Sequence, residues 1–265
     1  MKKALCFLPG HHGNYLARLV DISAGLIPDF NFISSNGTAH NNKRDKGNVT
    51  FQRVCVGELP WEDDAKNQYD WAQDDCIHEL TGKDVSIVWE QDNVFETVYH
   101  FFRNVRDRNL EILDDRIVPD AFKMCPSEFK NRNLLVYPKY FNNLNKIDKQ
   151  MYIDWFVYQF HVVKQLTVTQ PRLDFCFKLN WLYSETNVFL KHFFNLLEFL
   201  NLEYKVDITE HHKNFLKARQ TMFDAKKSKG GIFQSAYHLY LEQPDIDIDI
   251  EAVGPRYKSY FKKNH

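Results

Sequence analysis

The sequence lacks the short motifs that mark most nucleotide-dependent enzymes. It has no Walker A run, in which a lysine and a serine or threonine follow the last glycine. It also has no Gly-x-Gly-x-x-Gly fingerprint of a dinucleotide-binding fold. The five cysteines are far apart, and none forms a Cys-x-x-Cys pair. We therefore expect reduced, mostly buried thiols and a cytoplasmic location.

A surplus of charge and long apolar runs are also missing. The formal net charge is −1, so the chain as a whole does not attract nucleic acid or an anionic membrane. No stretch approaches the ~20 apolar residues of a membrane helix. The first apolar run stops at Pro9, which makes it too short for a secretion signal. These absences predict no nucleic-acid partner and no membrane partner.

What is present suits an α/β protein. The 265 residues are 44% hydrophobic and 15% aromatic, enough for a sizeable core. Residue patterns predict strands that alternate with helices, without a repeat or a linker. We expect one domain over residues 1–265, with a mainly parallel sheet, helices on both faces and a helical C-terminal part from about residue 184. The predicted strands are 3–8, 49–56, 84–89, 134–137 and 173–178, and the main helices are 14–26, 93–113 and 148–166.

The first thirty residues organise the rest of this prediction. A short apolar strand ends at Leu8, Pro9 to Gly13 form a turn, and an amphipathic helix begins at Asn14. Glycines allow a tight turn and a close approach of the backbone to a ligand. The unpaired N–H groups and the positive dipole end of the helix then face the turn. This layout is typical of a phosphate-binding loop, although it also occurs as plain α/β scaffolding.

The side chains of this turn narrow the chemistry. Asn14 and Tyr15 stand where a Walker A loop has its lysine and its serine or threonine, which disfavours a kinase or NTPase. Backbone amides, two imidazoles and one carboxamide can hold a phosphate or sulfate without a metal. The predicted binding residues are therefore Gly10, His11, His12, Gly13, Asn14 and Tyr15, with no metal site.

At this point the chain resembles the P-loop sulfotransferase superfamily. The run His11 to Tyr15 occupies the place of the family loop that binds the 5′-phosphosulfate. Residues 85–102 are similar to the segment for the donor 3′-phosphate, and residues 175–202 to the late strand-and-helix segment. The resemblance implies a P-loop NTPase-like three-layer sandwich. It also implies transfer of a sulfuryl group from 3′-phosphoadenosine 5′-phosphosulfate to a hydroxyl or amine of a small-molecule or glycan acceptor.

The resemblance has gaps at the 3′-phosphate segment. Aligned on the strand at 85–89, the family arginine falls at Glu90 or Gln91, and the family serine falls near Val98. A rival alignment uses the run from Arg103 to Arg108, which resembles the family Arg-Asn-Pro-x-Asp-Arg sequence. Arg103 is then a candidate cofactor-binding residue. A solvated helix face explains the same arginines.

Sulfuryl transfer needs a base that takes the acceptor proton, and histidine suits this role near neutral pH. His78 lies where the family often has its catalytic histidine, in a segment predicted to be helical over 62–80. His12, in the loop itself, is the alternative. Two further functions stay open: a non-catalytic phosphate- or partner-binding protein on a degenerate P-loop scaffold, and a nucleotide-sugar glycosyltransferase. The lack of a DxD motif in a suitable loop disfavours the latter.

Overall fold

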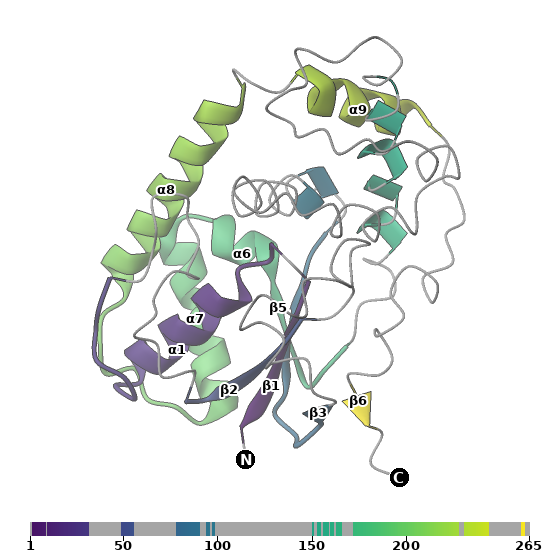
Figure 1. Ribbon diagram of the computed structural model, residues 1–265. Helices are drawn as coiled ribbons and strands as arrows, with labels where there is room; N and C mark the ends of the chain where they lie inside the picture. Colours follow the sequence, from purple (N-terminus) through teal and green to yellow (C-terminus); the bar gives the residue numbers. More distant parts are fainter. Residues whose placement is uncertain are drawn as a thin grey trace, which may run out of the picture.

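The structure is a computed structural model of the full chain (Figure 1). It describes residues 2–8, 10–31, 49–55, 78–90, 94, 95, 97, 98, 150, 153, 154, 156–158, 160, 161, 163–165, 172–227, 231–243, 261 and 262. The predicted strand at 134–137 and Arg103 lie outside these residues.

A four-stranded parallel sheet forms the centre of the described fold. The strands are β1 (Lys3–Phe7), β2 (Phe51–Cys55), β4 (Val85–Val88) and β5 (Phe175–Lys178), in the order β2-β1-β4-β5. All three neighbouring pairs are parallel. The α/β class and the parallel pairing that the sequence predicted are therefore confirmed for this sheet.

One face of the sheet carries large apolar side chains. Leu5, Val85, Ile87 and Phe177 point into a buried cluster that extends through α1 (Gly13–Ser23) and α7 (Thr186–Leu200). These residues alternate along their strands with small ones on the opposite face, as the period of a strand requires. The three-layer sandwich stays a prediction.

Carboxylates hold the amino ends of the strands. Asp84 accepts hydrogen bonds from the amide of Ala4 at 2.6 Å and from the amide of Thr81 at 2.8 Å. Asp174 accepts one from the amide of Asp84 at 3.0 Å. Asp21, near the end of α1, accepts the amide of Thr50 at 3.0 Å and its hydroxyl at 2.6 Å. Each aspartate thus fixes the entry into a strand.

Helices fill the C-terminal part of the described chain. They are α6 (Leu179–Tyr183), α7, α8 (Thr209–Lys227) and α9 (Gly231–Glu242). The helical part thus begins five residues before the predicted start, because Leu179 and Leu182 are buried and hold a short helix directly behind β5. Extended backbone at Ser184 then separates α6 from α7.

A second, small sheet pairs distant parts of the chain. β3 (His78–Glu79) runs parallel to β6 (Phe261–Lys262), near the N-terminal end of β1 (Figure 1). The predicted helix over 62–80 was wrong at its end, because His78 and Glu79 form this strand. Within the described residues, none of the helices is both long and apolar enough to cross a membrane.

Candidate functional site

The candidate site follows from the strand order. The chain moves from β1 to β2 on one side and later to β4 on the other side of β1. The order therefore reverses between β1 and β4. In open α/β sheets, ligands bind at such a reversal, outside the carboxyl ends of the strands. The turn between β1 and α1 lies at this point, on the carboxyl edge of the sheet.

The structure requires glycine at the two positions of the turn for different reasons. Gly10 has φ +85°, a conformation that glycine adopts without strain. Gly13 lies against the ring of Phe7, and a Cβ at this position would stand 2.2 Å from a ring carbon. Packing against β1 therefore explains Gly13 without a ligand.

His11 bridges the reversal point. Its side chain is fully buried, and Nε2 lies 3.2 Å from the hydroxyl of Thr97, in the helical segment after β4. The imidazole also meets the indole of Trp89 edge-on, with ring centroids 5.0 Å apart. His11 therefore joins the end of β1 to the segment that follows β4.

His12 and Tyr15 face an aromatic wall. His12 caps α1 in the left-handed conformation, with φ +57°, and its ring lies 5.0 Å from Phe215 and 5.8 Å from Tyr183. Tyr15 stacks on Phe215 at 4.3 Å, and burial raises the pKa of its hydroxyl well above the usual value. The Tyr15 side chain thus belongs to the core, and its backbone amide is the group placed at the turn.

Asn14 is held by a cation from the neighbouring strand. Nη1 of Arg53, on β2, donates to Oδ1 of Asn14 at 2.6 Å. This bond fixes the orientation of the carboxamide, because its oxygen faces Arg53. Arg53 adds a positive charge beside the first turn of α1. The site therefore contains a guanidinium that the sequence analysis did not assign.

A second polar group lies at the ends of β4 and β5. Glu90 accepts hydrogen bonds from Nζ of Lys178 at 2.9 Å and from Nδ2 of Asn180 at 3.1 Å. The hydrogen bond and charge of Lys178 lower the pKa of Glu90, so this carboxylate is ionised at neutral pH. We refer to Glu90, Lys178 and Asn180 as the Glu90 cluster.

Helix α6 connects this cluster with the turn. Asn180 and Tyr183 are three residues apart, so they lie on the same side of α6. Asn180 contacts Glu90, and Tyr183 contacts His12. The guanidinium of Arg219, on α8, lies 3.8 Å from the centre of the Tyr183 ring. The helix therefore runs along the carboxyl edge, with a cation stacked on its far end.

The predicted residues are not all brought together. Gly10, His11, His12, Gly13 and Asn14 converge at the turn, as their sequence requires. His78 instead pairs with Phe261 in the small sheet at the other end of the strands (Figure 1). The turn before β4 confirms this location, since the hydroxyl of Thr81 lies 3.5 Å from the carbonyl oxygen of Lys2. The structure thus separates His78 from His12.

Sequence reasoning missed Arg53, Thr97, Lys178, Asn180 and Arg219. A usable signal existed for Lys178 and Asn180, which stand at the end of a predicted parallel strand. The signal for Arg53 was weaker. Polar and apolar residues alternate in its strand, and this pattern does not show which strand lies next to it or whether the pairing is parallel. Thr97 and Arg219 depend on long-range packing, which chain order does not reveal.

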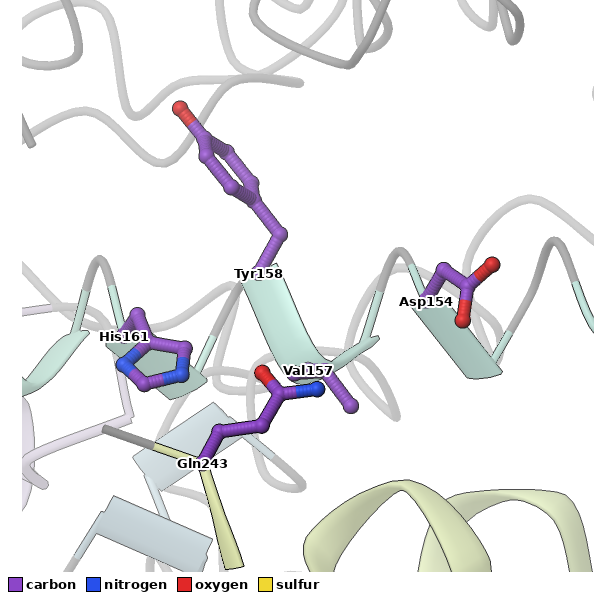
Figure 2. Close-up of a pocket in the computed structure, with 5 residues that line it drawn as sticks. All are labelled: Asp154, Val157, Tyr158, His161 and Gln243. Atoms are coloured by element: carbon purple, nitrogen blue, oxygen red, sulfur yellow. The ribbon is translucent and has the colours of Figure 1, made fainter. Parts of the chain in front are cut away.

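A pocket of about 230 Å³ lies elsewhere, between the helical segment around residues 150–165 and the end of α9. Figure 2 shows His161 beside Gln243, with the Tyr158 side chain pointing away from both. His161 also meets the Tyr240 ring edge-on at 4.9 Å, and Asp154 accepts a hydrogen bond from Gln150 at 2.9 Å. These contacts explain the polar lining as helix packing.

Within the described residues, no group of three or more histidine, cysteine or acidic side chains is arranged to hold a metal ion.

Comparisons with known proteins do not extend this description. No family model, no curated protein and no solved structure matches the chain. The functional argument therefore depends on the carboxyl edge of the sheet itself.

Proposed function

We propose that this protein is a sulfotransferase-like enzyme that binds the phosphosulfate of a nucleotide donor over residues 10–14. The donor class is 3′-phosphoadenosine 5′-phosphosulfate, and the acceptor is a hydroxyl or an amine. The observation that supports this most is the coincidence of the glycine-bounded turn with the reversal of strand order. The P-loop NTPase-like sandwich belongs to the same proposal.

Charge around the turn supports an anionic ligand. The amides at the start of α1 carry the positive end of the helix dipole. Arg53 stands beside Asn14, and Arg219 is stacked on Tyr183 next to His12. Arg53 thus contacts a residue of the turn directly, and Arg219 reaches the turn through Tyr183. Two guanidinium groups in these positions favour a phosphate or sulfate over a neutral ligand.

His12 is the proposed base. As the acceptor oxygen or nitrogen forms a bond to sulfur, its proton passes to the His12 imidazole. The bond between sulfur and the bridging oxygen of the donor breaks, and the electron pair stays on the phosphate. The turn amides and nearby cations stabilise the negative charge that develops there. His78 takes no part, because it lies at the amino end of the strands.

The test is calorimetric titration with 3′-phosphoadenosine 5′-phosphate, the product of the donor. Measurable heat with saturation is expected, and no heat or thermal shift at millimolar ligand would contradict the proposal. The His12→Asn variant keeps a residue that tolerates the left-handed conformation. We expect about 100-fold slower transfer, which is the scale of lost general-base catalysis, while the backbone amides of the turn still bind the nucleotide. His238→Asn, at an exposed position on α9, is the matched control.

A second candidate is a non-catalytic binding protein on the same scaffold. The observation that favours it is the pairing of Glu90 with Lys178, because Glu90 or Gln91 stands where the family that the sequence resembles has an arginine. This candidate predicts nucleotide or phosphate binding without transfer, and His12→Asn then leaves every measurable activity intact.

A further inference from the structure

The Glu90 cluster is not used by the proposed transfer step. It joins the ends of two neighbouring strands, with contacts of 2.9 Å and 3.1 Å to the carboxylate. We propose that this cluster is a subsite that binds the hydroxyl groups of a sugar. The inference rests on the proposed function only for the position of the ligand's anionic group.

The chemistry of the cluster matches hydroxyl groups. An ionised carboxylate only accepts hydrogen bonds, whereas the ammonium of Lys178 and the amide of Asn180 donate them. Each sugar hydroxyl both donates and accepts, so two adjacent hydroxyls can pair with this mixed set. The carboxylate and the ammonium also cancel in charge, which disfavours a second anion at this point. Side chains of Lys178 and Glu90 are 49% and 51% exposed, so a ligand can reach them.

The position of the cluster matches a nucleotide or sugar ligand. A carboxylate near the carboxyl end of a strand is a common partner of ribose hydroxyls in α/β folds. Glu90 follows Trp89, whose indole contacts His11 in the turn. Asn180 and Tyr183 are one helical turn apart, about 5–6 Å, and Tyr183 contacts His12. A ligand with its anionic group over the turn therefore places the adjoining sugar near the cluster.

Two sources of the sugar share this chemistry. If the sugar is the donor ribose, its free 2′-hydroxyl pairs with the cluster, and a nucleotide without ribose hydroxyls binds more weakly. If the sugar belongs to the acceptor, a neutral glycoside binds in a manner that depends on Glu90, and the ribose hydroxyls of the nucleotide make little difference.

The experiment is calorimetry on the full chain with five probes. They are adenosine 5′-phosphate, its 2′,3′-dideoxy analogue, 3′-phosphoadenosine 5′-phosphate, inorganic phosphate and a neutral methyl glycoside. The variant is Glu90→Gln, and the matched control is Glu198→Gln, an exposed carboxylate on α7. Asn180→Ala is a second variant that removes a donor without changing charge. Thermal unfolding verifies that each variant is folded.

For the ribose source, adenosine 5′-phosphate should bind roughly tenfold more tightly than the dideoxy analogue, the scale of a hydrogen bond to a charged group. Glu90→Gln should reduce this ratio to about one, Asn180→Ala should reduce it partly, and Glu198→Gln should leave it unchanged. For the acceptor source, the glycoside should bind to the wild type and to Glu198→Gln but not to Glu90→Gln.

The remaining outcomes separate the two proposals. If phosphate or nucleotide binds but neither a preference for free hydroxyls nor glycoside binding depends on Glu90, the sugar subsite is overturned and the anion site remains. If a glycoside binds through Glu90 while no anion binds, the subsite stands and the proposed function falls. If no probe binds, both are overturned.

Discussion

The two edges of the central sheet use their polar side chains differently. At the amino edge, Asp21, Asp84 and Asp174 accept hydrogen bonds from backbone amides at the start of strands. At the carboxyl edge, polar side chains contact other side chains, as in the Asn14–Arg53 and Glu90–Lys178 pairs. The first arrangement fixes the backbone. The second gathers imidazole, guanidinium, ammonium and carboxylate groups, and it is therefore where chemistry is to be sought.

The largest expected effect is at the amino edge, in Asp84→Asn. Asp84 is 1% exposed and accepts backbone amides of Ala4 and Thr81. An asparagine amide group would face at least one of these donors, so we expect a loss of about 2–4 kcal/mol in the free energy of unfolding. Urea denaturation measures it, with Glu198→Gln as a control for the lost charge. A loss equal to that of the control would contradict the anchoring role.

The second prediction concerns the stability of the fold at acid pH, which depends on the buried side chain of His212. His212 on α8 lies 3.0 Å from the hydroxyl of Thr186 and 3.0 Å from the carbonyl oxygen of Leu182, so it ties α6 to α7 and α8. Burial lowers its pKa to about 4, although the hydrogen bond to Leu182 opposes this shift. The imidazole is therefore neutral in the folded protein.

Below pH 6.5 the unfolded chain protonates His212 whereas the folded chain does not, so stability falls as the pH decreases towards 4. The expected contribution is up to about 3 kcal/mol, fully present above pH 6.5. Denaturation of wild type and His212→Gln between pH 7 and pH 4 isolates it. Parallel pH profiles for the two proteins would show that His212 does not contribute.

The third prediction tests the turn as a packed element. In Gly13→Ala, the new Cβ would overlap the Phe7 ring, so we expect a loss of about 1–3 kcal/mol, typical of overpacking. Phe7→Leu combined with Gly13→Ala should recover part of it. If the two losses simply add, the close approach of Phe7 is not the reason for the glycine.

The smallest expected effect is at the bridge between the ends of β1 and β4. Thr97→Val keeps the shape of the side chain but removes the hydroxyl that lies 3.2 Å from His11. We expect a loss of about 1 kcal/mol. Thr97→Ser keeps the hydroxyl and its hydrogen bond, so its loss in the free energy of unfolding should be smaller. Thermal unfolding compares the two variants, and an equal or greater loss in Thr97→Ser would indicate packing alone.

Local patterns predicted the part of the fold that depends on neighbouring residues. The first strand, the turn and α1 were confirmed because apolar spacing and the positions of Gly10 and Gly13 determine them within about twenty residues. The β4 and β5 strands were also confirmed, since each is a short, mostly apolar segment that is recognised from its own residues.

The parts that were missed depend on pairs far apart in sequence. The sequence predicted a helix that ends with residues 78–80 and named His78 as a candidate base from its place in chain order, whereas His78 pairs with Phe261 in a small sheet. Chain order did not indicate at which edge His78 would lie. The contact of Glu90 with Lys178 joins residues 88 positions apart, and it required the order of β4 and β5.

The most direct test of the central claim is a titration of ¹⁵N-labelled protein with 3′-phosphoadenosine 5′-phosphate, followed by amide chemical shifts. If an anion binds at the carboxyl edge, the amide chemical shifts of residues 10–14 should change most. The amide chemical shifts of residues 49–50 and 81–84, at the amino edge, should not change. Unchanged amides at residues 10–14, or changes concentrated at the amino edge, would contradict the account.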